Sequence, residues 1–254
     1  MFHATAPGAR YAPAMGSVAR VRRAESLTDQ VAVELRTAVR DGRLVPGRLY
    51  SAYQLADDLG VSRSPVREAL LRLAEVGLVR FERNRGFRVL LPPPEDIAEV
   101  FAVRMALEVP AVRRVARRAD PAVAARLRGE LDAMAEAAAA GDVARFMHHD
   151  QGLHAGVLDA AGNRRAAAIV ANLRDVTRLI GAATVEISRS LADIRAEHEP
   201  VVDAVERGDP DAAAGALAAH LEHTGRLLVA QAAREQGAAV SPAGVDRLWA
   251  EIVG

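Results

Sequence analysis

The chain of 254 residues lacks cysteine and lysine, and it has no long apolar run. Without cysteine there can be no disulfide bond and no thiolate metal ligand, so we expect a cytoplasmic protein. Without lysine no Schiff base can form, and pyridoxal-phosphate chemistry is excluded. No uncharged apolar stretch approaches the ~18 residues that a membrane-spanning helix needs, so we expect no membrane segment.

Charge is distributed unevenly along the chain. The formal net charge is +0, but residues 1–91 contain 15 Arg against 9 Asp and Glu, and the remainder contains 18 Arg against 24. The length allows two modest domains, and a basic front half fits a nucleic-acid-binding module attached to a second domain. Residues 1–25 contain Pro, Gly and scattered Arg without an apolar core, so we expect a disordered tail and no signal peptide.

The segment GVSRSPVREALLRLAEVGLV, from Gly60 to Val79, predicts a helix after a tight turn. Ser62 is a good N-cap, because its hydroxyl can accept a hydrogen bond from a free backbone N–H group. Apolar residues recur at helical spacing and should face a core. They are Val66, Leu70 and Leu73.

The exposed first turns of this helix carry hydroxyls and guanidiniums. These side chains are Ser62, Arg63, Ser64 and Arg67. A helix N-terminus favours phosphate, and arginine can bond a guanine edge with two hydrogen bonds. We therefore expect a recognition helix that enters the major groove of DNA.

The flanking segments complete a winged helix-turn-helix over residues 26–91. Before the recognition helix, SAYQLADDLGVS predicts a short helix that buries Leu55 and Leu59. After it, apolar residues alternate on both sides of a basic turn, which predicts a two-stranded wing. The alternating residues are Val79, Phe81, Phe87 and Val89, and the turn contains Asn84, Arg85 and Gly86. A helical pair with surface arginines in another kind of domain is the alternative interpretation.

Residues from about Leu27 to Val89 resemble the bacterial GntR family of transcription regulators, most closely in SRSPVREALLRLAEVGLV. The preceding RDGRLVPGRLY resembles the family's loop between its first two helices. Tyr53 departs from the pattern, since the family commonly has a charged residue, often Arg, at this position. With Tyr53 and the wing included, the expected DNA-binding residues are Tyr53, Ser62, Arg63, Ser64, Arg67, Arg85 and Gly86.

The rear half predicts an all-α helical bundle over residues 95–235. A proline linker, residues 92–94, is followed by acidic first-turn residues, and turn signals then divide the sequence into about six helices. Their expected ranges are 95–118, 122–139, 142–160, 163–182, 184–207 and 210–234. Residues 236–254 should form a loosely ordered tail, with one or two amphipathic turns around Trp249. The expected fold class is therefore mainly α, a winged helix-turn-helix followed by a helical bundle.

Four side chains of the bundle form a candidate metal site. Asp150 and His154 are spaced i,i+4 on one helix face, while His198 and His220 lie on apolar stripes of two later helices. One carboxylate and three neutral imidazoles suit a divalent ion such as Zn²⁺, Ni²⁺ or Mn²⁺. The alternative is that these histidines are core residues with ordinary hydrogen-bond partners.

Residues 95–232 resemble the ligand-binding helical domain (FCD type) of the FadR-type branch of GntR regulators. In that domain an Asp-x-x-x-His pair and two later histidines bind a metal, which the segments DQGLH, AEHEPVVDAVERGD and AAHLEH match. The resemblance also implies that Arg104 faces an effector cavity, where it could clamp a carboxylate. The alternative for Arg104 is an ion pair with Glu108 at i+4. Asn172, with Arg174 and Arg178 on the same helix, is a further candidate for the cavity lining.

The expected function is a ligand-responsive transcription regulator, most simply a repressor, and not an enzyme. A homodimer would place two winged helices on a palindromic operator in double-stranded DNA, and a small organic acid bound beside the metal would modulate that binding. The alternatives are a direct metal sensor and a metal-dependent enzyme fused to a DNA-binding domain. An acyl-CoA sensor is disfavoured, because that lineage lacks the Asp-His₃ set.

Overall fold

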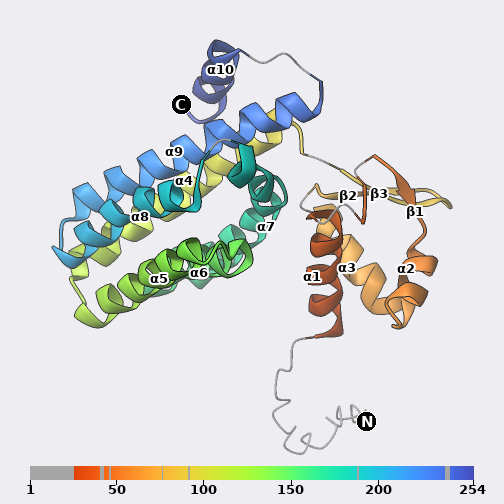
Figure 1. Ribbon diagram of the computed structural model, residues 1–254, viewed down its shortest axis with the longest axis horizontal. Helices are drawn as coiled ribbons and strands as arrows, with labels where there is room; N and C mark the ends of the chain where they lie inside the picture. Colours follow the sequence, from red (N-terminus) through yellow and green to blue (C-terminus); the bar gives the residue numbers. More distant parts are fainter. Residues whose placement is uncertain are drawn as a thin grey trace, which may run out of the picture.

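The computed structural model describes residues 26–40, 43–45, 47–75, 77–90, 92–187, 189–237 and 241–254. The chain folds into an N-terminal part with a small sheet and a larger C-terminal helical part (Figure 1). This arrangement confirms the predicted fold class. The N-terminal elements are α1 (Leu27–Arg40), β1 (Leu49–Tyr50), α2 (Ala52–Asp58), α3 (Arg63–Glu75), β2 (Val79–Glu82) and β3 (Gly86–Val89).

The N-terminal part is a winged helix-turn-helix in which α3 packs on α1 and α2. The predicted apolar stripe of α3, Val66, Leu70 and Leu73, is buried. The short helix α2 differs from the prediction, because Ala56 is its buried residue, whereas Leu55 and Leu59 are only half-buried. A seven-residue helix has room for one residue directed fully into the core, and the smaller side chain takes that place.

Polar contacts fix α1 against α3. The hydroxyl of Thr28 donates to Glu68 Oε2 at 2.9 Å, and Arg72 Nη1 donates to Asp29 Oδ1 at 2.6 Å. Thr28 is buried, so its hydroxyl would lose the energy of hydration if it had no partner. These bonds hold the recognition helix α3 in a fixed orientation on its support.

The wing is an antiparallel pair of strands, β2 and β3, and β1 adds to the other edge of β3, giving the order β1-β3-β2. Asn84 turns the chain between β2 and β3 with φ 58, a left-handed conformation that Asn tolerates. Gly86 follows with φ 127, and a Cβ atom there would lie 2.0 Å from the carbonyl oxygen of Tyr50. Phe81, expected on the core face, is 40% exposed, because it lies on the edge strand β2, whereas its partner Phe87 lies on the central strand β3.

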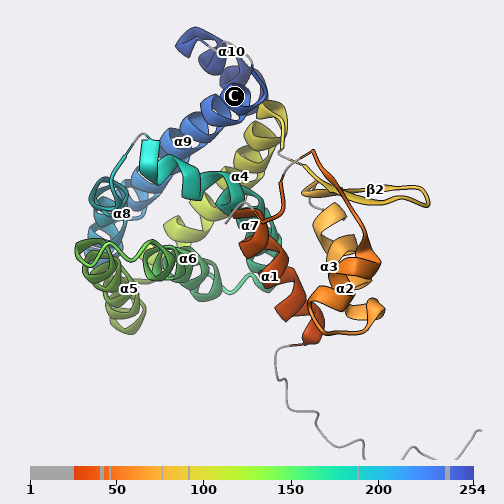
Figure 2. The same ribbon diagram turned by 45° about the vertical axis from the view of Figure 1, so that its right-hand side comes forward.

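The C-terminal part contains seven helices within the described residues, one more than predicted. The long helices α4 and α9 lie side by side, and α5 packs on α6 (Figures 1 and 2). Among the described residues, none of the helices combines the length and the apolar character that a bilayer crossing requires. The helices are α4 (Pro94–Arg118), α5 (Pro121–Ala139), α6 (Val143–Ala160), α7 (Arg164–Ile187), α8 (Leu191–Glu206), α9 (Pro210–Glu235) and α10 (Pro242–Ile252).

Three predicted boundaries of the C-terminal part were wrong. The proline linker is shorter than residues 92–94, because Pro94 is already the first residue of α4. The break between α7 and α8 lies several residues later than predicted, since Ser190 and Asp193 form a reciprocal capping box at the start of α8. The predicted C-terminal tail contains the eleven-residue helix α10, which Ser241 caps and Pro242 begins.

Helix α10 is anchored by Trp249, which is 4% exposed. Its ring lies 6.0 Å from the ring of Phe101 on α4, between ring centres, and close to Gly225 on α9. A Cβ atom at Gly225 would approach the Trp249 ring to 2.2 Å, so only glycine leaves room for the indole. Arg226 of α9 also pairs with Asp246 of α10. The last helix therefore braces α4 and α9 at one end of the bundle.

Candidate functional site

The predicted DNA-binding side chains at the start of α3 lie together on the surface. Tyr53 on α2 is 60% exposed. The guanidinium of Arg63 stacks on its ring, with the Cζ atom 4.2 Å from the ring centre. Stacking on an aromatic ring restricts the side-chain freedom of an arginine while its N–H groups remain available. The exposed side chains of this surface are Tyr53, Ser62, Arg63, Ser64 and Arg67.

The wing presents a second basic surface. Arg85 is exposed and lies 3.7 Å from Glu82, whereas Arg88 pairs with Glu82 and donates to the carbonyl oxygen of Gly47 at 2.6 Å. Arg88 therefore ties the wing to the loop before β1, and Arg85 is the more accessible guanidinium. Gly86 is half-buried beneath Tyr50, so it has a structural role in the wing that its sequence context did not reveal.

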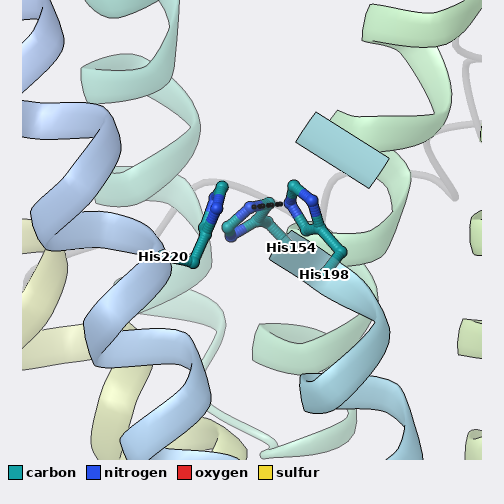
Figure 3. Close-up of side chains that lie close together, drawn as sticks. All are labelled: His154, His198 and His220. Atoms are coloured by element: carbon teal, nitrogen blue, oxygen red, sulfur yellow. Dashed lines mark hydrogen bonds between the residues drawn. The ribbon is translucent and has the colours of Figure 1, made fainter. Parts of the chain in front are cut away.

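In the helical part, three histidines from three helices meet in the core. His154 lies on α6, His198 on α8 and His220 on α9, and their side chains converge between the helices (Figure 3). One ring nitrogen from each lies within 4.8 Å of the others. All three residues are buried, with exposed fractions of 1%, 0% and 6%. The structure thus brings together three of the four predicted metal ligands.

The Nδ1 atom of each histidine faces a hydrogen-bond acceptor. His154 Nδ1 lies 2.5 Å from Glu108 Oε2, His198 Nδ1 lies 2.8 Å from the carbonyl oxygen of Ile194, and His220 Nδ1 lies 2.9 Å from Glu197 Oε2. A neutral imidazole has one N–H group, which these acceptors hold on Nδ1. Each Nε2 atom is then left with a lone pair, as a metal ligand requires.

The fourth predicted ligand, Asp150, adjoins the histidines. Its Oδ1 atom lies 3.2 Å from His198 Nε2, and His198 Nε2 lies 3.2 Å from His154 Nε2. With Nδ1 protonated in both histidines, these contacts bring lone pairs together without a hydrogen atom between them. Arg174 pairs with the other oxygen, Oδ2. Such an arrangement of lone pairs becomes favourable when a cation lies among them.

Burial and neighbouring charges favour the neutral form of His154 and His220 and the charged form of Glu108 and Asp150. Burial, assisted by the charge of Arg174, lowers the pKa of His154 to about 4. Burial and the neighbouring histidines hold the pKa of His220 well below its usual value. Burial alone would raise the pKa of Glu108 and Asp150, but the charges of Arg104 and Arg174 outweigh it, and both pKa values lie below the ordinary range. Neutral imidazole and ionised carboxylate are the ligand forms that bind metals.

A pocket adjoins the candidate metal site, and His220 and Asp150 of that site line the pocket. Its cavity volume is about 60 Å³, which accommodates a few water-sized groups, and the pocket is open to solvent on one side. Arg104 lines it with 3% exposure and donates from Nε to Glu108 at 2.7 Å, so it combines a place on the pocket wall with the ion pair considered as the alternative, here buried and not at the surface. The other polar residues of the lining are Arg174, Thr177, Arg189 and Thr224.

Two family models match the chain. The model for "Bacterial regulatory proteins, gntR family" matches residues 27–89, and the model for the FCD domain matches residues 99–223. A "Probable D-xylose utilization operon transcriptional repressor" from Paenarthrobacter nicotinovorans is 34% identical over 184 residues, which cover 72% of this chain and 80% of that protein. The chain belongs to the GntR family.

Solved structures agree with this assignment. E. coli McbR/YncC has the same fold, with a TM-score of 0.69 and 24% identity over 81% of this chain and 98% of that one. A putative GntR transcriptional regulator from Rhodococcus sp. RHA1 gives a TM-score of 0.66 and 29% identity over 80% and 97% of the two chains. This GntR-family protein is therefore a DNA-binding transcription regulator and not an enzyme.

One predicted effector residue of this GntR regulator was wrong. Asn172 is exposed on α7 and does not line the pocket, whereas Arg174 is buried and does. Residues two positions apart in sequence are separated by about 200° around an α-helix. A helix that directs Arg174 inward therefore directs Asn172 outward. The side chain of Arg178 lies outside the described residues.

The contacts of two carboxylates with the GntR regulator's histidines were not predicted from the sequence. Glu108 was considered only as a partner of Arg104, yet it also holds His154 of α6. Glu197 was not considered, although it holds His220 of α9 while its neighbour in sequence, His198, faces the other histidines. Both carboxylates act between helices, and helix periodicity within one segment carries no signal for such contacts.

Proposed function

We propose that this regulator is a repressor whose helical domain binds a divalent metal ion and a small carboxylate, and that the carboxylate weakens binding to the operator. The observation that carries the proposal is the convergence of ring nitrogens from three histidines, with every Nδ1 atom facing an acceptor, at the wall of an arginine-lined pocket. The repressor described for the relative from Paenarthrobacter supports the direction of regulation.

The ligands of the ion would be His154, His198, His220 and Asp150. Three imidazoles and one carboxylate suit Zn²⁺, Ni²⁺ or Mn²⁺, and an open coordination position could accept an oxygen of the effector. When bound, the ion supplies a Lewis acid for that oxygen. The protein's own contribution is to orient the imidazoles through Glu108, Glu197 and the Ile194 carbonyl group.

The charge of the pocket favours an anion as the effector. Its three arginines are each paired with one carboxylate, so these groups sum to zero while the histidines are neutral. The pairs are Arg104 with Glu108, Arg174 with Asp150, and Arg189 with Glu197. A divalent cation adds two positive charges to a largely buried site, and an uncompensated buried charge is costly. A small organic acid, such as an α-hydroxy acid or a dicarboxylic acid, supplies the compensating charge.

A homodimer would allow the two recognition helices to read a palindromic operator. Two half-sites related by two-fold symmetry require two symmetrically placed winged helices. Light scattering at micromolar concentration should give the mass of a dimer. A monomer both free and on DNA would contradict this part of the proposal.

DNA binding measured with metal and acid varied separately tests the function. Fluorescence anisotropy with a DNA fragment from upstream of the regulator's own gene should show metal-dependent release by malate, lactate or citrate. Release by zinc alone would instead indicate a direct metal sensor. Release by an acid with equal potency before and after removal of metal by a chelator would contradict the metal site.

The variant Arg104→Ala tests the effector site. A hydrogen bond to a charged group contributes about 1.5–3 kcal/mol, so the acid concentration for half-release should rise at least about tenfold. Operator affinity without acid should stay unchanged, because Arg104 lies on α4 and outside the winged helix. Arg113→Ala is the matched control, since Arg113 lies on the same helix but pairs with Asp211 at the surface. Wild-type sensitivity in Arg104→Ala would remove Arg104 from the effector site.

A further inference from the structure

Three arginine–carboxylate–histidine chains connect the pocket to the three histidines, and we call each chain a relay. In every relay the arginine lines the pocket, the carboxylate pairs with it, and the same carboxylate contacts one histidine. The relays are Arg104–Glu108–His154, Arg174–Asp150–His198 and Arg189–Glu197–His220. In the first and third relays the carboxylate holds Nδ1, and in the second it meets Nε2 itself.

Each arginine of a relay also has a buried nitrogen without a hydrogen-bond partner among the described residues. These atoms are Arg104 Nη2, Arg174 Nε and Arg189 Nε, and Arg195 Nε, outside the pocket lining, shares this property. The three side chains are only 3%, 7% and 9% exposed. A buried charged donor without a partner is costly, and native proteins usually satisfy such groups. Three arginines around one pocket, each with a remaining N–H donor, therefore favour an anionic ligand with several acceptor oxygens.

We propose that the pocket takes a small dicarboxylate through these three arginines, and that Glu197 is a positioning residue that couples the affinity for this anion to the affinity for the metal. The inference rests on the proposed function, because it requires both ligands to bind. It adds the class of the acid, two further arginines and a physical connection between the two ligands.

Glu197 is suited to this coupling because it shares its charge between two partners. Arg189 Nη1 donates to both of its oxygens at 3.1 and 3.0 Å, and His220 Nδ1 lies 2.9 Å from Oε2. When Arg189 donates to an anion in the pocket, it compensates less of the charge on Glu197. Glu197 then accepts the His220 N–H group more strongly, which makes the opposite nitrogen, Nε2, a more basic ligand.

The coupling must be reciprocal, because linkage between two binding equilibria is symmetric. An anion that raises metal affinity by a given factor has its own affinity raised by the metal by the same factor. Direct contact between the anion and the ion would also produce coupling. A test of the relay must therefore change Glu197 while it leaves the histidines and the pocket arginines in place.

The variant Glu197→Gln makes this change, and Glu199→Gln is its matched control. Glu199 lies on the same helix but pairs with Arg195 near the surface, away from the pocket. Calorimetry on the full-length protein gives the Kd of L-malate before and after loading with Zn²⁺, and acetate serves as the monocarboxylate comparison. The ratio of the two malate Kd values is the coupling factor, for which allosteric proteins give about 5- to 150-fold.

The wild-type protein and Glu199→Gln should share one coupling factor, and Glu197→Gln should show a several-fold smaller one. Zinc affinity of Glu197→Gln should also fall by about 10- to 100-fold, as for other residues that orient a ligating histidine. A wild-type coupling factor in Glu197→Gln overturns the relay, even if malate binds. Malate that binds the wild-type protein no more tightly than acetate overturns the dicarboxylate pocket, and an absence of zinc binding overturns the proposed function itself.

Thermal unfolding shows whether Glu197→Gln is folded. If that variant does not fold, Arg189→Gln tests the same relay, because it removes the arginine that lines the pocket. Arg195→Gln is its control. The coupling factor should fall in Arg189→Gln and stay at the wild-type value in Arg195→Gln. Equal coupling in the two variants overturns the relay.

Discussion

Replacement of His198 by alanine should separate the contribution of a bound metal from that of a buried side chain. His198 has 0% exposure, its Nδ1 atom is held by the Ile194 carbonyl oxygen, and its Nε2 atom lies 3.2 Å from both His154 Nε2 and Asp150 Oδ1. The substitution therefore removes the most central ligand. It also empties a buried position, which destabilises the protein even without metal.

The magnitude follows from linkage. Zinc at 100 times its Kd stabilises the folded state by about 2.7 kcal/mol, because it binds the folded protein and not the unfolded chain. For a protein of this size 1 kcal/mol corresponds to about 2–4 °C, so zinc should raise the Tm of the wild-type protein by roughly 5–11 °C. The same zinc concentration should leave the Tm of His198→Ala almost unchanged, since the site has lost the ligand that contacts both Asp150 and His154.

Thermal unfolding of the wild-type protein and of His198→Ala, each measured with a chelator and with zinc, separates the cost of the lost side chain from the contribution of the metal. The difference between wild type and variant in chelator is the cost of the empty position, and the additional difference in zinc is the metal contribution. His149→Ala is the control, because His149 lies on α6 near His154 but pairs with Glu130 outside the site. An equal zinc shift in wild-type protein and His198→Ala would show that other residues hold the metal.

The remaining predictions concern DNA binding and the fold. Arg63→Ala should weaken operator binding by about 1–3 kcal/mol in anisotropy titrations, and an unchanged affinity would exclude base reading by this side chain. Tyr53→Leu should reproduce part of that loss and Tyr53→Phe should not, because the ring and not the hydroxyl supports Arg63; equal losses would refute stacking as the cause. In chemical denaturation Gly86→Ala should destabilise the protein more than Gly60→Ala, since both glycines have positive φ but only Gly86 has a backbone oxygen in the way of a Cβ atom. Trp249→Ala should cost about 3–5 kcal/mol, and a Tm equal to the wild-type value would mean that α10 does not brace the bundle.

The sequence predicted elements wherever local chemistry decides the conformation. The recognition helix was predicted correctly because its capping position, its apolar stripe and its polar start lie within one segment of about twenty residues. The start of α8 was predicted too early, although Ser190 and Asp193 carry a capping signal, because α7 continues through Gly181 to Ile187. Helix α10 was underestimated because a short helix gains most of its stability from packing, here of Trp249 on Phe101 and Gly225.

The candidate site was predictable only in part. His198 and His220 could be found because they lie on apolar stripes, which direct their side chains toward the core, and His154 because it shares a helix face with Asp150; the resemblance to the FCD domain supported the set. The carboxylates that orient them could not, since Glu108 and Glu197 reach histidines on other helices. Asn172 was assigned in place of Arg174 because the rotation of α7 depends on contacts with its neighbours. Contacts between helices therefore set the part of the site that the sequence left open.

The helix α4 begins five residues after β3 ends, so it would act as a lever between the pocket and the wing if an effector tilted it. Arg104 lies ten residues from Pro94, which corresponds to about 15 Å along the axis at the usual helical rise. A tilt of about ten degrees about Arg104 moves the start of the lever by roughly 2.6 Å. In a symmetric pair of chains two such displacements add to roughly 5 Å, which exceeds the ~3.4 Å rise between neighbouring nucleotides. A tilt of this size would shift two recognition helices by more than one base pair relative to each other.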